Sequence, residues 1–214
     1  MKPLVFLLLT VSAFAQKPPI PPMPTFADEF DGNELDLTKW SPHDPLRSVY
    51  AAGVATVSAG QAHLAPGAAI ATFGLFSQTY GRFEIRCKVA AGSGVKSGFH
   101  LLPVPLAALP SIDVFTFAGA EPRKIFFANH WGTEQTERSY GDSFDGPDLS
   151  GDFHVIAVEW DAGKVVWSLD GKERFRSDDG VPGQKMFLLI EAEGGTLDVD
   201  YVRVYGSTSS PAGQ

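Results

Sequence analysis

Cysteine is almost absent from this chain, which has Cys87 as its single copy among 214 residues. One cysteine cannot form an intramolecular disulfide, so the fold must be held together by its core. Cys87 lies in a stretch that alternates apolar and polar residues, which indicates a buried thiol. Apolar burial raises the pKa of a thiol, and no histidine lies near it in sequence to activate it. The sequence therefore disfavours a cysteine nucleophile.

Positive charge and long apolar runs are also scarce. Lys and Arg number 17 against 25 Asp and Glu, which gives a formal net charge of −8. This acidity disfavours nucleic acid and anionic membrane surfaces as partners, but says little about a neutral polysaccharide. No apolar stretch approaches the roughly 20 residues that a membrane-spanning helix needs. We expect a protein that does not span a membrane and does not bind nucleic acid.

The first 15 residues have the pattern of an export signal. Lys2 supplies positive charge, Pro3–Ser12 form a short apolar run, and Ala13–Ala15 form a small-x-small cleavage site. We expect cleavage after Ala15 and a secreted or periplasmic location. Loss of Lys2 takes the net charge from −8 to −9. The expected order is a signal peptide at 1–15, a proline-rich linker at 16–25, one domain at 26–206 and a disordered tail at 207–214.

Alternating apolar and polar residues dominate the domain. Tyr80–Val89 places four apolar side chains on one face and four charged ones on the other, which is typical of a half-buried strand. Asp170-Gly171 suits a type I′ hairpin turn. No long amphipathic helix and no internal repeat is found, so many short strands predict a sandwich or barrel. Further strands are expected at 153–160, 164–169, 172–175, 186–190 and 197–205.

One strand carries a single acid in an apolar setting. In Ser111–Phe117, Ser111 and Asp113 share a face because side chains on a strand alternate. Thr116 joins them only if a β-bulge adds one residue after Asp113, and bulges are common beside active sites. Taken alone, the stretch equally fits an ordinary half-buried strand with a solvated Asp.

Several segments, in order, resemble the family-sixteen glycoside hydrolases, which cleave β-glucans, agars and carrageenans. The resemblance implies a concanavalin-A-like jelly roll: two antiparallel sheets, one of them concave and carrying a glycan cleft. We expect a monomer whose partner is a polysaccharide or oligosaccharide of β-glucan type. The matching segments are Phe26–Gly32, Leu35-Asp36, Lys39-Trp40, Tyr80–Arg86, Phe99–Pro103, His130–Gly132, Phe153–Trp160 and Val199–Tyr205.

The resemblance also implies a catalytic strand of the pattern Glu-x-Asp-x-x-Glu, with the first Glu as nucleophile and the last as acid/base. Here Ser111 and Thr116 stand at the glutamate positions and Asp113 remains. Retaining hydrolysis needs two carboxyl groups about 5 Å apart. A hydroxyl group is a weak nucleophile without a base and does not donate a proton as a carboxylic acid does. We therefore expect a domain of β-glucanase descent without standard hydrolytic activity, for which weak polysaccharide binding remains.

The expected cleft differs from the family pattern as well. Lys96 and His100 replace two tryptophans, which reduces the flat surface on which sugar rings stack. His130 and Trp131 stand where the family has a His-Trp/Tyr-Gly strand. We expect His130 to be a hydrogen-bonded cleft residue and Trp131 to be the remaining nearby aromatic. These four residues are the candidates for substrate binding.

Two other functions remain open. Glu191 and Glu193 lie two apart on an expected strand, so they share a face and could act as relocated acids with Asp113, unless that face is simply solvated. A hydrolase that combines Ser111 and Asp113 with a histidine would need a Gly-x-Ser-x-Gly elbow, which is absent. The other alternative is a structural or interaction module of the cell envelope with no sugar ligand.

No cofactor is expected from the residues themselves. Asp142, Asp145 and Asp148 lie in a Gly/Pro-rich stretch whose spacing is not that of an EF-hand, so we interpret them as turn formers. The resemblance implies that a structural calcium is possible on the convex side, where Asp200 and Glu29 occupy the corresponding positions. No Cys/His cluster indicates zinc.

Overall fold

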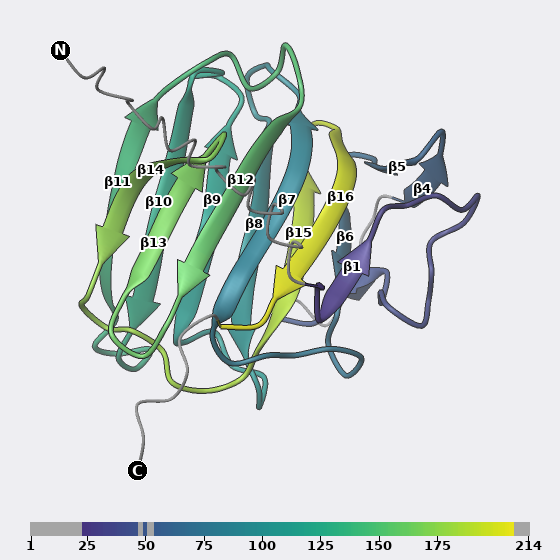
Figure 1. The fold of residues 1–214 in the computed structure, drawn as a ribbon. Coiled ribbons are helices and arrows are strands. Elements are labelled where there is room, and N and C mark those ends of the chain that lie inside the picture. Colours follow the sequence, from purple (N-terminus) through teal and green to yellow (C-terminus); the bar gives the residue numbers. More distant parts are fainter. Residues whose placement is uncertain (1–22, 47–48, 51–53, 208–214) are drawn as a thin grey trace, which may run out of the picture.

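The computed structural model describes residues 23–46, 49–50 and 54–207, and its elements are β-strands arranged in two packed antiparallel sheets (Figure 1). This confirms the expected all-β sandwich. The predicted signal peptide, most of the proline-rich linker and most of the tail lie outside the described residues. Within the described part, no helix has the length and apolarity needed to cross a membrane.

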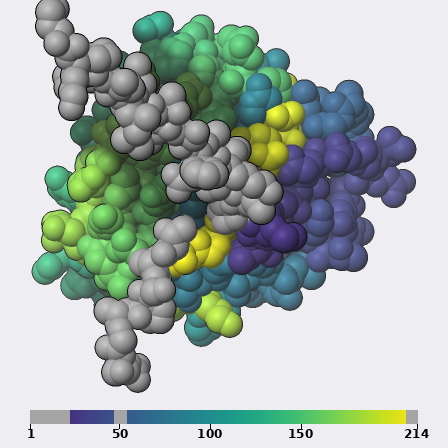
Figure 2. Space-filling view, in the orientation of Figure 1, coloured from purple at the N-terminus to yellow at the C-terminus, as the bar shows by residue number. Residues whose placement is uncertain are grey.

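The first sheet has eight strands and contains both ends of the domain. In the space-filling view, the purple segment around β1 lies beside the yellow strand β16, with which β1 pairs (Figure 2). In spatial order the strands are β14 (Lys172–Ser177), β13 (Val165–Leu169), β12 (His154–Trp160), β7 (Gly81–Val89), β16 (Leu197–Tyr205), β5 (Gln61–Leu64) and β4 (Ala55–Ser58), with β1 (Phe26–Asp28) on β16.

The second sheet has six strands and carries the residues of interest. Its spatial order is β11 (Arg138–Asp145), β10 (Lys124–Trp131), β9 (Ser111–Ala118), β8 (Lys96–Pro103), β15 (Met186–Glu193) and β6 (Ala68–Ala71). A short hairpin, β2 (His43–Asp44) and β3 (Val49–Tyr50), lies near β6, where Ser41 forms a bridge to Ala71.

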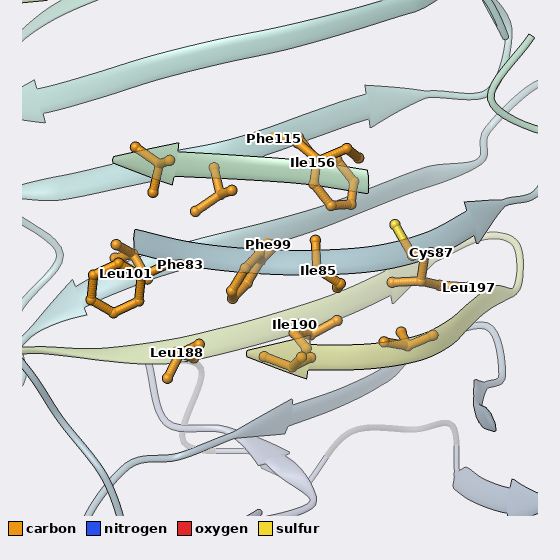
Figure 3. Packing of buried hydrophobic residues seen from close by; sticks show 14 of the residues in the cluster. Phe83, Ile85, Cys87, Phe99, Leu101, Phe115, Ile156, Leu188, Ile190 and Leu197 are labelled. Carbon is orange, nitrogen blue, oxygen red and sulfur yellow. The ribbon is translucent and has the colours of Figure 1, made fainter. Parts of the chain in front are cut away.

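The core fills the space between the sheets. Phe83, Ile85 and Cys87 of β7 face the second sheet, from which Phe99 and Leu101 point back (Figure 3). All five are buried. Each large apolar side chain of this kind stabilises the fold by roughly 2–3 kcal/mol when it leaves water. The predicted face of β7 is therefore confirmed, and burial raises the pKa of the Cys87 thiol, as expected for an unreactive cysteine.

One expected turn region is a strand instead. Asp148 does form a turn, since its carboxylate accepts hydrogen bonds from the backbone and the hydroxyl of Ser150. Asp142 and Asp145 lie on β11, so their interpretation as turn formers was wrong. β11 is an edge strand exposed along most of its length, and it carries no apolar alternation that would reveal it in the sequence.

The Asp170-Gly171 turn joins β13 to β14 as predicted. Both residues have positive φ angles, 51° and 72°, which a type I′ turn requires. The Asp170 carboxylate also accepts a hydrogen bond from the backbone of Val155, 3.0 Å away. The turn therefore ties the hairpin to β12.

Replacing Gly171 by Ala tests this turn. An added Cβ would meet no atom within 4 Å, so the cost comes only from the left-handed backbone, and we expect the free energy of unfolding to fall by about 1 kcal/mol. Chemical denaturation measures the change. The control is Gly163→Ala, where the added Cβ makes an ordinary contact with Asp161, and which should stay within about 0.5 kcal/mol of the unmodified protein. Equal losses in both variants would contradict the turn assignment.

Candidate functional site

A β-bulge in β9 brings Asp113 and Thr116 to one face. Phe115 pairs with Phe99 on β8, but the next pair along β8 is His100 with Asp113, so Val114 is an extra residue. The pairing with β10 shows the same shift. Val114 and Phe115 are both buried in the core, whereas Asp113 and Thr116 are partly exposed. The condition under which Thr116 shares a face with Asp113, a bulge after Asp113, is therefore met.

We call the side of the second sheet that is turned away from the core its outer face. Directly paired residues of neighbouring strands point to the same side. Asp113 pairs with His100 and with Ala128, and Ser111 pairs with His130. Across β15 to β11, the outer face therefore carries Glu191, Glu193, Lys96, Gly98, His100, Ser111, Asp113, Thr116, Phe126, Ala128, His130, Ser139, Gly141 and Ser143.

Asp113 lies between two histidines on this face. The Nδ1 atom of His100 is 2.7 Å from Asp113 Oδ1, and the Nε2 atom of His130 is 3.2 Å from Asp113 Oδ2. Each ring has a second carboxylate on its other nitrogen. Glu191 Oε1 is 3.6 Å from His100 Nε2, an ion pair beyond hydrogen-bond distance, and Glu137 Oε1 is 3.2 Å from His130 Nδ1. We call these five residues the acid–histidine chain.

The surroundings of the chain fix its charges. Burial alone would lower the pKa of His100, but the carboxylates of Asp113 and Glu191 outweigh it and raise that pKa to about 10. Burial would raise the pKa of Asp113, and the two histidines overcome this and hold it well below its usual range. The hydrogen bond to Asp113 raises the pKa of His130. At neutral pH, Asp113 is therefore a carboxylate beside the imidazolium of His100, and its contact with His130 favours the charged form of that ring as well.

The scaffold holds these side chains in place from two directions. The indole Nε1 of Trp167, on the other sheet, donates a 2.8 Å hydrogen bond to the backbone carbonyl of Asp113. The ring of His100 lies over Gly98, where an added Cβ would overlap its Nε2 and Cε1 atoms. Glycine at position 98 thus leaves the space that the His100 ring occupies.

The structure brings most of the sequence-predicted residues to this face. Ser111 is nearly buried, and Thr116 is partly exposed opposite Gly98. Glu191 and Glu193 share the outer face, as expected if their face is the functional one. Lys96 is exposed and pairs with Glu193 at the far end of β8.

Trp131 does not join this group. Its neighbour His130 points outward, whereas the Trp131 ring lies against Gly180 in the segment after β14. Asn129 is also turned that way, and its amide donates to the carbonyl of Asp179. The position of Trp131 therefore does not support its prediction as the cleft aromatic, and Phe126 is the aromatic ring that the described strands β8 to β11 place on the outer face.

Glu137 is a site residue that the sequence did not suggest. It lies beyond the end of β10, in the connection that leads to β11, and its carboxylate returns to His130. No motif marks it. Only the register of the β10–β11 hairpin, which pairs Trp131 with Arg138, indicates that the preceding residue lies close to His130.

The two proposed calcium positions lie in separate ion pairs. Both oxygens of Glu29 accept hydrogen bonds from Arg203, at 2.8 and 2.7 Å. Asp200 accepts one from Arg86 at 2.6 Å. Among the described residues, no group of three or more His, Cys, Asp or Glu is placed to hold a metal ion. As arranged, these carboxylates do not fit a shared calcium, and calcium binding stays a prediction of the resemblance.

The sequence of this chain matches a known protein family over most of the domain. The family model described as glycosyl hydrolases family 16 matches residues 33–185. The chain belongs to this family. It is 28% identical over 153 residues to the endo-1,3-1,4-β-glycanase ExsH of Rhizobium meliloti, a match that covers 64% of this chain and 32% of ExsH. The family 16 domain thus spans about a third of that relative's length.

Solved structures agree with the family 16 fold. The laminarinase from Rhodothermus marinus superposes with a TM-score of 0.75 and 25% identity, covering 89% of this chain and all of that one (100%). A mutant of SCLam, a non-specific endo-β-1,3(4)-glucanase of the same family, gives a TM-score of 0.76 at 21% identity, covering 88% and 96% of the two chains. The jelly roll implied by the resemblance is therefore confirmed.

The arrangement limits what this family 16 site can do chemically. Asp113 is held ionised and hydrogen-bonded at both oxygens, so it is neither a free nucleophile nor a proton donor near neutral pH. The most accessible group of the acid–histidine chain is the Glu137 carboxylate, whose side chain is 54% exposed, and the His130 ring beside it is 24% exposed. These groups can hydrogen-bond a ligand that lies on the outer face.

Replacing His100 by Gln tests the charge of the acid–histidine chain. The folded-state pKa of His100, about 10, lies above its ordinary value of 6.5. The stability that its charge contributes is therefore complete below pH 6.5 and is lost as the pH rises to 10. We expect His100→Gln to cost roughly 3 kcal/mol of unfolding free energy in mildly acidic buffer. That cost should shrink steadily as the pH approaches 10.

The measurement is denaturant unfolding of both proteins across this pH range. The control is His154→Gln, because His154 pairs with a half-exposed carboxylate of Asp170 at 2.8 Å, and its loss should cost less than about 1 kcal/mol. A cost of His100→Gln that stays constant from acid to alkaline pH would show that the ring is not charged in the folded protein.

Proposed function

We propose that this family 16 domain binds a β-glucan-type oligosaccharide on its outer face without hydrolysing it by the standard family mechanism. The observation that carries the proposal is the state of the β9 strand. Hydroxyl residues, Ser111 and Thr116, stand at the positions where the resemblance implies glutamates, and both share a face with Asp113. Each carboxylate oxygen of Asp113 already forms a hydrogen bond with a histidine ring, one with His100 and one with His130.

Hydrolysis with retention needs one carboxylate to attack and one carboxylic acid to donate a proton. Asp113 remains ionised at neutral pH because the two histidines lower its pKa. The raised pKa of His130 makes its protonated ring a weaker acid than an ordinary imidazolium. Glu191 faces the His100 imidazolium rather than a second carboxyl group. This geometry disfavours Asp113 and Glu191 as a relocated nucleophile and acid.

Several features support glycan binding. Ala128 and Gly141 are small, so ligand atoms could approach the sheet closely, beside the polar groups of Thr116 and His130. Relatives support the ligand class: ExsH is named an endo-1,3-1,4-β-glycanase. The SCLam mutant was co-crystallised with 1,3-β-D-cellotriosyl-glucose and presents 1,3-β-D-cellobiosyl-glucose at its active site. Export after residue 15 would bring this domain to such glycans.

Binding without cleavage is the first expected result. With Phe126 as the outer-face aromatic of the described strands β8 to β11, stacking is limited, and we expect a Kd no tighter than about 10⁻⁴ M, roughly −5.5 kcal/mol. Titration calorimetry with laminarin-type and mixed-linkage oligosaccharides measures it, and a reducing-sugar assay on the same samples should stay at background. Glu137→Gln should weaken binding about fivefold, because the loss of one hydrogen bond costs roughly 1 kcal/mol of binding free energy.

Glu173→Gln is the matched control, because Glu173 is an exposed carboxylate paired with Arg176 on the first sheet. It should leave the affinity unchanged. Absence of binding to every glycan in the panel would reject the proposed function in favour of a structural or interaction module.

Restoring the family pattern tests the cause of inactivity. The double variant Ser111→Glu with Thr116→Glu should hydrolyse a β-glucan that neither single variant cleaves, because nucleophile and acid act as a unit. The added acids will lower stability, since each raises the pKa of its neighbours. Release of reducing ends measures activity. Robust release by the unmodified protein, lost on Glu191→Gln or Glu193→Gln, would instead establish relocated catalytic acids.

A further inference from the structure

A second apolar cluster lies on the outer face, separate from the core. Its members point away from the first sheet, since Leu189 is paired with His100 and with Ala71, and Phe187 is paired with Leu102. All are nevertheless buried, with exposures of 0 to 5%. The ring of Phe73 packs against Phe187, with centroids 5.0 Å apart. The cluster consists of Ala69, Ala71, Leu102, Phe187 and Leu189, with Phe73 packed on it.

Exposure along the outer face therefore changes from one edge of the sheet to the other. Figure 1 shows β6 and β11 at opposite edges of the second sheet. One cross-strand row runs through Ala71 and Leu189, both buried, to His100 and Asp113, which are partly exposed. It continues through Ala128, also partly exposed, and ends at Gly141, which is exposed. Along this row the face is open over β9 to β11 and filled over β15 and β6, whereas at the other end of β15 Glu191 is partly exposed and Glu193 is exposed.

The two ends of the strands also differ on the outer face. At the β10 end nearest the turn, Glu137 reaches back to His130 and closes over the end of the strand. At the opposite end of the sheet, Lys96 on β8 and Glu193 on β15 are exposed. A ligand chain that enters from β11 thus meets the acid–histidine chain and then the apolar cluster.

We propose that this outer face is closed on the β15 and β6 side and accepts the end of a glycan chain rather than an internal segment. The inference rests on the proposed function and specifies its ligand. From β8 to β11 there are three strand spacings of about 4.8 Å, roughly 14 Å in all, which is room for a short oligosaccharide only. An internal segment would need both sides open, and the cluster fills one of them.

The experiment compares β-1,3-linked glucan probes that have free chain ends with one that has none. A linear hexasaccharide, a long linear chain counted per chain end and a cyclic β-1,3-glucan are titrated into the full-length protein. We expect equal affinity for the two linear probes within about twofold and at least tenfold weaker binding of the cyclic one. Equal binding of the cyclic probe, or affinity per end that rises with chain length, would overturn this inference alone. Failure of all linear probes to bind would instead reject the proposed function, and this inference with it.

A pair of variants tests the cluster as the boundary. Phe73→Ala removes the ring that packs on Phe187, so the cyclic glucan should gain affinity towards that of the linear probes. Phe76→Ala is the matched control, because Phe76 lies in the same segment, is partly buried and packs on Phe26 on the core side. It should keep the discrimination. Circular dichroism shows whether the Phe73→Ala variant is folded. If the folded variant still binds the cyclic glucan at least tenfold more weakly than the linear probes, the cluster is not the boundary. If the variant does not fold, the comparison of the three probes on the unmodified protein still decides the proposal.

Discussion

The largely desolvated charge of Asp113, whose side chain is 21% exposed, is the constraint on which the candidate site depends. A carboxylate removed from water costs several kcal/mol unless partners compensate it. Here the compensation comes from neighbouring strands, through His100 on β8 and His130 on β10. Trp167 of the other sheet holds the backbone of this residue in place, because its indole donates to the carbonyl of Asp113. Each histidine in turn faces a further carboxylate. One buried acid therefore ties together β8, β9, β10 and β15 across the outer face.

The same arrangement shows how the family 16 scaffold separates the fold from the residues of the outer face. The core packs on the opposite side of each strand, so Val114 and Phe115 stabilise the sandwich whatever stands at Asp113 or Thr116. The β-bulge keeps the spacing of the family motif. Residues on the outer face can then change without loss of the fold, and the pair His100 and His130 and an apolar cluster occupy much of that face.

The residues by themselves were sufficient for the fold class, because alternation and turn chemistry are local properties. The alternating stretch of β7 and the Asp170-Gly171 turn were predicted within a residue or two. β11 was missed because Tyr140 and Phe144 on its inward side alternate with Arg138 and Asp142, so the sequence shows no clear apolar period. Glu137 was missed for a related reason, since its contact with His130 arises from hairpin register and not from any motif.

Sequence alone determined the two-sheet architecture, the family resemblance and the hydroxyl residues Ser111 and Thr116 on the catalytic strand. Only the tertiary structure decided which side chains meet. It placed Glu191 beside His100 and turned Trp131 away to Gly180. It also buried Phe187 and Leu189 on the face opposite the core. The physical reason is that hydrophobic alternation is written along one strand, whereas ion pairs and burial depend on distances between strands far apart in the chain.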